Sequence, residues 1–295
     1  MSIVITGATG QLGRLTVEAL LRRGVPAEQI TATGRRTETL SDLADQGVTV
    51  RRADYNDPAS LDEAFAGADR VLLISSSEVG QRAAQHGNAI DAAKRADVDL
   101  VAYTSIPKAD SSSLLLAEEH RATEELLAES GLPHVLLRNS WYTENYTAQL
   151  PVFLEHGIAG AAGQGRVSAA TRADFADAAA AVLTENGHAG ATYELGGPAF
   201  TMTELADVVT GTTGRTVTYT DLPVEQYTQV LVGAGLPEPV AAVFADGDRG
   251  IARGELHVDT SDLEKLLGRP ATPLADAVGE AATALVIDGE VGSHS

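Results

Sequence analysis

Over the first 140 residues, short segments predicted as strands alternate with longer segments predicted as helices. The strands are predicted at residues 2–6, 31–33, 48–50, 71–74, 100–103 and 135–137, and the helices at residues 12–23, 58–65, 82–95 and 114–130. Strands separated by helices of this length form βαβ units, which close right-handed into a parallel sheet. We therefore predict an α/β fold with a doubly wound parallel sheet of Rossmann type, in the strand order 3-2-1-4-5-6. The ligand crevice of such a sheet lies at the carboxyl ends of its strands.

The pattern changes after Asn139, where residues 140–170 become rich in glycine and turn residues. Helices are expected near Leu150, over residues 171–183 and after a Thr201 cap, and strands are expected at residues 192–195 and 216–220. The first of these strands would be a seventh strand of the sheet. Residues 223–285 have a helical pattern, with interruptions expected at Pro237, at Pro239 and in the glycine-rich stretch 247–254. We interpret this part as a small, mostly helical lobe over the crevice.

The composition excludes several kinds of chemistry. The chain has no cysteine, which rules out disulfides, thiolate nucleophiles and Cys-ligated metals. Its formal net charge of −20 disfavours nucleic acid and anionic membranes as partners, because both bind basic surfaces. No run of 18 apolar residues occurs, and the first strand begins too early to leave room for a signal peptide. We expect a cytoplasmic protein that binds neither nucleic acid nor membrane and holds no metal.

A glycine motif, Gly7-Ala8-Thr9-Gly10-Gln11-Leu12-Gly13, joins the first predicted strand to the first predicted helix. In a dinucleotide site the first glycine permits a sharp turn, the second lets the backbone approach the pyrophosphate, and the third lets the helix pack on the strand. The start of the helix then offers free N–H groups to the phosphates. The motif predicts a nicotinamide dinucleotide site, and the alternative is a turn with only a structural role.

The end of the second strand distinguishes the two nicotinamide cofactors. An NAD enzyme usually has an acidic residue there, which binds the ribose hydroxyls. This chain has Gly34-Arg35-Arg36 instead, in an otherwise acidic sequence. Arginine suits a 2′-phosphate through paired hydrogen bonds and charge, so we predict NADP(H), with NAD(H) possible. The alternative is a basic turn that faces solvent.

Polar residues follow the next strands at the same edge of the sheet. Asp54 follows the third strand, where it could accept a hydrogen bond from adenine or begin the next helix. Ser75 and Ser76 follow the fourth strand, on the path expected for the ribose and nicotinamide. Thr104 and Ser105 follow the fifth, where we expect the nicotinamide end of the cofactor. We include all five among the cofactor-binding residues.

The glycine motif, Tyr103-Thr104-Ser105, Glu118-Glu119-His120 and the run Leu137-Arg138-Asn139-Ser140-Trp141-Tyr142-Thr143-Glu144-Asn145-Tyr146 together resemble the NmrA-like atypical short-chain dehydrogenases. In particular, the chain is similar to the subgroup of type 2 NADPH:quinone oxidoreductases and triphenylmethane dye reductases. The resemblance covers nearly the whole chain. The glycine motif is common to many enzymes, whereas the run after Leu137 is far more specific.

The resemblance implies a flavin-free NADPH site with a quinone held beside the nicotinamide. It assigns the pyrophosphate to Gly7, Thr9, Gly10, Gln11 and Leu12, to which the glycine motif adds Gly13. It assigns the 2′-phosphate to Arg35, and it places Asn139, Trp141 and Tyr142 in the substrate pocket. The alternatives are that both aromatic residues only anchor a loop, that Asn139 bonds its own loop, and that Arg138 is an ion-pair partner.

The usual Tyr-x-x-x-Lys catalytic pair of short-chain dehydrogenases is absent. The helix after the fifth strand has His120 and Glu124 at a comparable spacing and contains no lysine. This subgroup often lacks the pair, so its absence argues against alcohol dehydrogenase or epimerase chemistry rather than against the resemblance. Proton delivery could come from water, His120 or Tyr142. The alternative role for His120 is to orient its neighbours through hydrogen bonds.

We therefore predict an NADP-binding Rossmann domain over residues 1–140, a mixed region over 141–289 that completes the sheet and forms the substrate lobe, and a disordered tail over 290–295. The predicted activity is a flavin-independent, NADPH-dependent transfer of hydride to a quinone or a similar flat acceptor. The first alternative is a catalytically silent NADP(H)-binding redox sensor of the NmrA type. The second is an isomerase or reductase that acts on some pathway intermediate. A monomer and a homodimer both fit the sequence.

Overall fold

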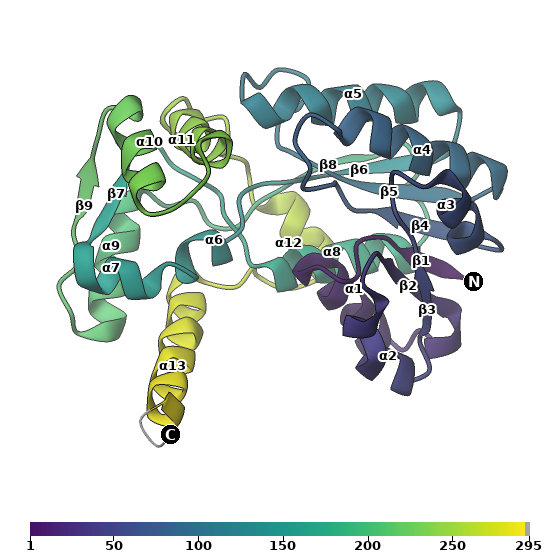
Figure 1. Ribbon diagram of the computed structural model, residues 1–295, viewed down its shortest axis with the longest axis horizontal. Coiled ribbons are helices and arrows are strands. Elements are labelled where there is room, and N and C mark those ends of the chain that lie inside the picture. Colours follow the sequence, from purple (N-terminus) through teal and green to yellow (C-terminus); the bar gives the residue numbers. More distant parts are fainter. Residues whose placement is uncertain (293–295) are drawn as a thin grey trace.

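The computed structural model describes the backbone of residues 1–292 and the side chains of residues 1–285. Its main feature is a parallel sheet of seven strands in the order β3-β2-β1-β4-β5-β6-β8 (Figure 1). The strands are β1 (Ile3–Ile5), β2 (Ile30–Gly34), β3 (Thr49–Arg52), β4 (Arg70–Leu73), β5 (Leu100–Ser105), β6 (His134–Asn139) and β8 (Thr192–Leu195). The predicted order of the first six strands is confirmed, and β8 is the predicted seventh.

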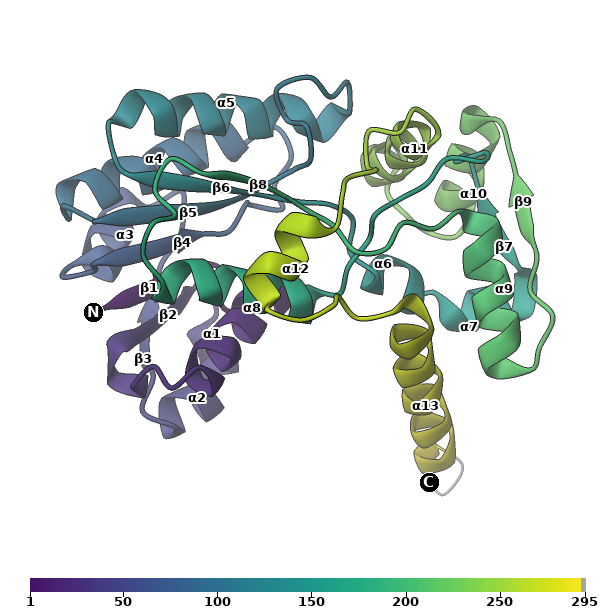
Figure 2. The same cartoon turned by 180° about the vertical axis from the view of Figure 1, so that it is seen from behind.

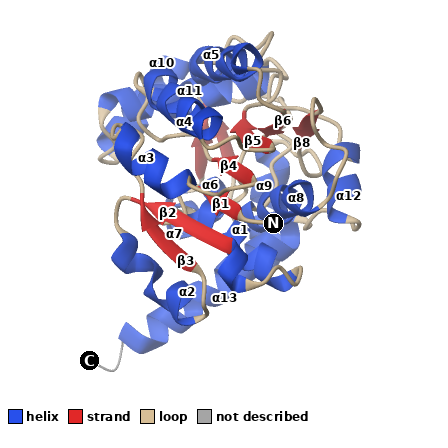
Figure 3. Ribbon diagram, turned by 90° about the vertical axis from the view of Figure 1, so that its right-hand side faces the viewer, coloured by secondary structure: helices blue, strands red, loops and turns tan. Residues whose placement is uncertain are grey.

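Helices cover both faces of this sheet (Figure 3). One face is covered by α1 (Gln11–Arg22) and α8 (Arg172–Thr184), and the core there joins Val17, Leu20 and Phe175 to the sheet. The other face is covered by α3 (Pro58–Phe65), α4 (Arg82–Arg95) and α5 (Leu115–Ser130), and its core includes Phe65 and Tyr103. A sheet buried on both faces requires strands that are apolar throughout, as Val71 to Leu73 of β4 are.

Further elements form a second, smaller lobe beside the carboxyl ends of the strands (Figures 1 and 2). They are α6 (Glu144–Thr147), α7 (Leu150–His156), β7 (Ile158–Gly160), α9 (Met202–Thr213), β9 (Tyr219–Asp221), α10 (Val224–Gly233), α11 (Glu238–Ala252) and α13 (Leu274–Gly292). A separate apolar cluster, which includes Phe153, Phe200 and Val209, holds this lobe together. The helix predicted after a Thr201 cap is α9, and Thr201 and Glu204 form a capping box at its start.

The structure corrects two predictions in this lobe. The strand expected at residues 216–220 is β9 at Tyr219–Asp221, and it pairs with β7, which the sequence analysis did not predict. The helical interruption expected at residues 247–254 occurs only at the end of that stretch, because α11 continues through Gly247 and Gly250 and ends at Ala252. A side chain at Gly247 would meet the ring of Trp141 at 3.1 Å, and one at Gly250 would overlap Leu114. These glycines therefore permit close packing of the helix rather than end it.

Two segments complete the structure. After the small lobe, the chain returns to the sheet through α12 (Ser261–Leu267), which packs beside α8 (Figure 2). The final helix, α13, reaches Gly292, so residues 290–292 of the predicted disordered tail are helical, while residues 293–295 lie outside the described part. The division into residues 1–140 and 141–289 stays a prediction. None of the described helices is both long and apolar enough to cross a membrane.

Candidate active site

A cavity of about 260 Å³ lies at the carboxyl ends of β1, β2, β3 and β4. Seven of the predicted cofactor residues line it: Gly7, Thr9, Gly10, Arg35, Asp54, Ser75 and Ser76. The lining also includes residues outside the predicted cofactor set, namely Thr6, Thr33, Gly34, Ala53, Tyr55, Ile74, Ser77, Glu78 and Gln85. Most of these stand at strand ends, where the doubly wound topology could have indicated them. Glu78 and Gln85 reach the cavity from the connection after β4 and from α4, which no strand pattern indicates.

The glycine motif forms the floor of this cavity. Gly7 has a φ of +60°, a conformation that suits glycine, and the Gly10 N–H donates to the Gly7 carbonyl over 2.9 Å. A Cβ atom on Gly13 would lie 2.5 Å from the Gly7 carbonyl oxygen and 2.7 Å from the Ala8 Cα atom. The turn at Gly7 and the close packing at Gly13 are therefore as the motif predicts, whereas the approach of a pyrophosphate to Gly10 stays a prediction.

The first turn of α1 is open to an anion. Gly10 is its N-cap and provides no side-chain hydrogen bond, and no acidic residue lies in the first turn. The first N–H groups of a helix have no partner within the helix, and they carry a partial positive charge. Gln11, Leu12 and Gly13 do not line the cavity, so any contact with a phosphate would come from their backbone N–H groups.

Two further residues shape the wall at the ends of β2 and β3. A Cβ atom on Gly34 would lie 2.5 Å from Cγ2 of Thr9, so glycine at this position lets β2 approach the turn. Asp54 lines the cavity, and its Oδ1 accepts a hydrogen bond from the Asn56 N–H over 2.9 Å. The helix α3 is capped by Asp57 instead, whose carboxylate accepts from the Ser60 N–H. Asp54 thus forms a local turn and also faces the cavity.

Buried side chains behind the cavity hold the segment that follows β4. The Ser75 N–H donates to Oγ1 of Thr104 over 2.9 Å, and the Ser76 N–H donates to Nε2 of His86 over 2.9 Å. The Nε atom of Arg82 donates to the Ser76 carbonyl oxygen. Burial, and then Arg82, lowers the pKa of His86 to about 3, so this ring is neutral at pH 7. The wall formed by Ser75 and Ser76 is therefore fixed from behind.

His120 belongs to this buried network and does not line the cavity; the residue is 5% exposed. Its Nδ1 lies 2.8 Å from the Tyr103 hydroxyl, and its Nε2 lies 3.4 Å from Nη1 of Arg82. Because arginine only donates, Nε2 accepts and the ring proton is on Nδ1. Burial, followed by the charges of Arg82 and His86, lowers the pKa of His120 well below its ordinary value. This geometry favours an orienting role, and a catalytic role stays a prediction.

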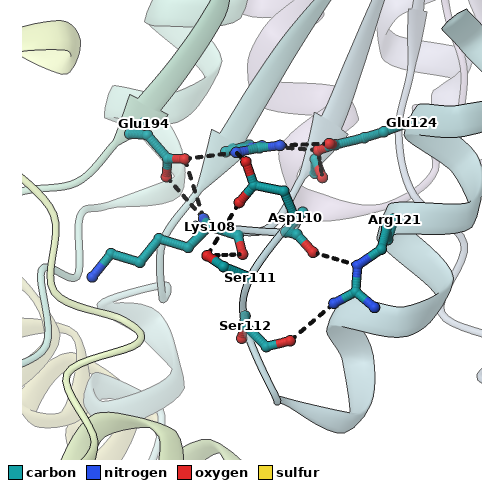
Figure 4. Close-up of polar contacts among 10 residues, drawn as sticks. Lys108, Asp110, Ser111, Ser112, Arg121, Glu124 and Glu194 are labelled. Atoms are coloured by element: carbon teal, nitrogen blue, oxygen red, sulfur yellow. Dashed lines mark hydrogen bonds and ion pairs between the residues drawn. The ribbon is translucent and has the colours of Figure 1, made fainter.

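Arg138 lies at the centre of an ion-pair network at the ends of β5, β6 and β8. Figure 4 labels three of its acidic partners, Asp110, Glu124 and Glu194. It donates to both carboxylate oxygens of Glu124, over 3.0 and 2.7 Å, and to Glu194 over 3.0 Å. The Ser105 hydroxyl donates to the same Glu124 over 2.6 Å. The ion-pair alternative for Arg138 is therefore what the structure shows. Ser105 is engaged here and Thr104 with Ser75, and neither Ser105 nor Thr104 lines the cavity, so their contact with the cofactor stays a prediction.

The residues predicted for the substrate pocket lie together after β6. The guanidinium of Arg172 stands 4.3 Å above the ring of Tyr142, and Phe175 meets the same ring edge-on. Burial raises the pKa of Tyr142, and the charge of Arg172 and a hydrogen bond from Asn139 oppose that rise. Tyr142 is therefore protonated at neutral pH and able to donate.

The other two residues of the predicted pocket differ in their surroundings. In the described part of the chain, the buried Oδ1 atom of Asn139 has no hydrogen-bond partner, which leaves one polar atom free for a ligand. Trp141 packs edge-on against Phe244 and against Gly247 of α11. This contact fits the anchoring alternative for Trp141, and substrate binding by the three residues stays a prediction. Among the described residues, no group of three acidic or histidine side chains is arranged to hold a metal.

Comparison with known proteins identifies the family. Residues 7–186 match the model of a family described as NAD(P)H-binding. The chain belongs to this family. It is 51% identical to quinone oxidoreductase 2 of Escherichia coli strain K12, over 94% of this chain and 97% of that protein.

Solved structures agree with this assignment. The crystal structure of the E. coli NADPH-dependent quinone oxidoreductase in complex with NADPH has a TM-score of 0.91 at 51% identity, covering 94% of this chain and 99% of that one. The triphenylmethane reductase of Citrobacter sp. in complex with NADP(H) has a TM-score of 0.90 at 41% identity, covering 95% of this chain and all of that one. The resemblance predicted from the motifs is thus confirmed.

Proposed function

We propose that this protein is a flavin-independent, NADPH-dependent reductase that transfers hydride to a quinone or a similar flat acceptor. The observation that carries the proposal is Arg35 in the wall of a cavity whose floor is the glycine turn. The 51% identity to a protein named quinone oxidoreductase 2 supports the choice of acceptor and does not favour the silent sensor. The cytoplasmic location and the monomeric or dimeric state expected from the sequence stay predictions.

The cavity has groups that would suit the phosphates of the cofactor and the path to its nicotinamide end. The backbone N–H groups at the start of α1, beside Gly10, would bind the pyrophosphate, and Arg35 would bind the 2′-phosphate. Ser75 and Ser76, fixed from behind, would guide the cofactor toward the ends of β5 and β6. Bound NADPH would supply the hydride.

The chain's own side chains would act on the acceptor. The free Oδ1 atom of Asn139 and the ring of Tyr142 would orient a flat substrate, and the protonated Tyr142 hydroxyl would donate to the oxygen on which negative charge develops. A quinone needs little acid assistance, because its reduced oxygen is stable near neutral pH. The absence of a Tyr-x-x-x-Lys pair is therefore compatible with this acceptor.

The purified protein, without added flavin, is expected to oxidise NADPH in the presence of 1,4-benzoquinone. The loss of absorbance at the nicotinamide band should match the quinone consumed, one to one. A parallel sample with NADH tests whether the second cofactor is used. If the protein binds NADPH but turns over no member of a panel of quinones and dyes, the sensor alternative replaces this proposal.

The rate at saturating NADPH is expected to stay constant within about twofold between pH 6 and 8.5. Neither candidate donor titrates in that range, because the pKa of His120 is lowered well below its ordinary value and that of Tyr142 is raised. Tyr142→Phe should lower kcat about tenfold, which is less than the roughly 100-fold or more that positioned proton donors usually contribute, because a quinone needs little acid assistance. A bell-shaped profile near pH 6.5 that vanishes in His120→Gln would instead assign proton transfer to the histidine.

A further inference from the structure

An ion pair spans the cofactor cavity. Arg35 follows β2 and Glu78 follows β4, and β1 with its glycine turn lies between these two strands in the sheet. The Nη1 atom of Arg35 lies 2.8 Å from Oε1 of Glu78, and both residues line the cavity. The side chains are 60% and 38% exposed, so the pair lies at the solvent side of the cavity.

The Glu78 carboxylate is held in this position. Its second oxygen, Oε2, accepts a hydrogen bond from Nε2 of Gln85 over 2.9 Å, and Gln85 is only 2% exposed. The backbone N–H of Glu78 donates to the Ser76 hydroxyl over 3.1 Å. Ser76 is in turn fixed from behind by His86 and Arg82. The carboxylate is thus a built part of the cavity rather than the free end of a surface side chain.

The charged side chains that line the cavity indicate how the Glu78 carboxylate would affect a bound 2′-phosphate. Within the described part of the chain, Arg35 is the only basic side chain in the lining, whereas Asp54 and Glu78 are acidic. A 2′-phosphate carries close to two negative charges and needs the guanidinium that Glu78 occupies. The ribose hydroxyl of NADH is uncharged and leaves the pair in place. Glu78 should therefore affect the affinity for NADPH more than the affinity for NADH.

We infer that Glu78 is a specificity-determining residue, which competes with the 2′-phosphate for Arg35 and so narrows the preference for NADPH over NADH. The inference rests on the proposed function, since it deepens the assignment of Arg35 to the 2′-phosphate. NADPH binding requires the Arg35–Glu78 pair to open and brings a dianion beside the carboxylate. NADH binding requires neither.

The test is a comparison of Glu78→Gln with the wild-type protein by isothermal titration calorimetry with NADPH and with NADH. Glutamine keeps the shape of the side chain and an oxygen for the Gln85 hydrogen bond. We expect the Kd for NADPH to fall about threefold to tenfold, as for the loss of an exposed ion pair and a nearby like charge, and the Kd for NADH to change less than about twofold. The effect of the substitution on the Kd for NADPH should be smaller at high salt, because salt screens exposed charges.

Two controls separate the possible causes. Glu28→Gln removes one negative charge from an exposed site that does not line the cavity, and it should leave both Kd values unchanged. In an Arg35→Ala background, Glu78→Gln should change the ratio of the two Kd values less than it does in the wild-type protein. The inference is overturned if Glu78→Gln leaves the ratio of the Kd values for NADPH and NADH unchanged, or if the variant binds NADPH more weakly than the wild-type protein. In either case, NADPH binding by the wild-type protein still supports the proposed function. If the wild-type protein does not bind NADPH, the inference and the proposed function both fail.

Discussion

Replacing Gly13 with alanine is expected to lower the affinity for NADPH by about 100-fold or more and to destabilise the fold by about 1–3 kcal/mol. The added Cβ atom would lie 2.5 Å from the Gly7 carbonyl oxygen and 2.7 Å from the Ala8 Cα atom, and both are backbone atoms that no rotamer change can move. The start of α1 must then move away from the turn after β1. That movement displaces the N–H groups that would bind the pyrophosphate.

The matched control is Gly211→Ala, which adds the same methyl group to another helical glycine. Gly211 lies in α9. Apart from its chain neighbours and the nearby backbone of α9, nothing lies within 4 Å of the place that an added Cβ atom would take, so alanine there should be neutral or stabilise the protein by about 1 kcal/mol. Thermal unfolding measures stability for both variants, and calorimetry with NADPH measures affinity. Wild-type affinity in Gly13→Ala would contradict the assignment of this turn to the pyrophosphate.

The sheet could be predicted because its determinants are local. Most strands of the sheet contain a short apolar run, and a helical pattern follows the first, third, fourth and fifth strands, so the βαβ rule and the doubly wound arrangement predict the order of six strands. The glycine turn follows from the same reasoning, since Gly7, Gly10 and Gly13 have distinct backbone requirements at fixed spacing. Residues at strand ends, such as Arg35 and Ser75, could therefore be assigned to the cofactor crevice by their position in the chain.

The rest depended on contacts between distant segments. Gly247 and Gly250 resemble helix breakers in sequence, but Trp141 and Leu114 pack against the positions where their side chains would be. Nothing in the local pattern indicates that Glu78 would pair with a residue that follows β2.

Ser105 illustrates a second limit. It stands at a strand end, where the sheet topology predicts cofactor-binding residues. Its hydroxyl nevertheless donates to Glu124, and it does not line the cavity. Position along the strand predicts which edge of the sheet a residue occupies, whereas the partner of its side chain depends on which charged groups other segments bring there.

Replacing Arg138 with methionine is expected to destabilise the protein by about 3–5 kcal/mol, the usual cost of removing one partner of a buried ion pair and leaving the other unpaired. Arg138 is 9% exposed and Glu124 is 10% exposed, so the carboxylate would stay buried with only the Ser105 hydroxyl as a donor among the contacts described. Burial alone lowers the pKa of Arg138, but its hydrogen bonds to Glu124 and Glu194 outweigh this and raise it, which indicates how strongly the charges depend on each other.

The double variant Glu124→Gln/Arg138→Met is expected to recover most of this loss, because the unpaired charge is then gone. Thermal unfolding of the wild-type protein and both variants measures this. A double variant as unstable as the single one would show that lost packing, and not the unpaired carboxylate, causes the loss.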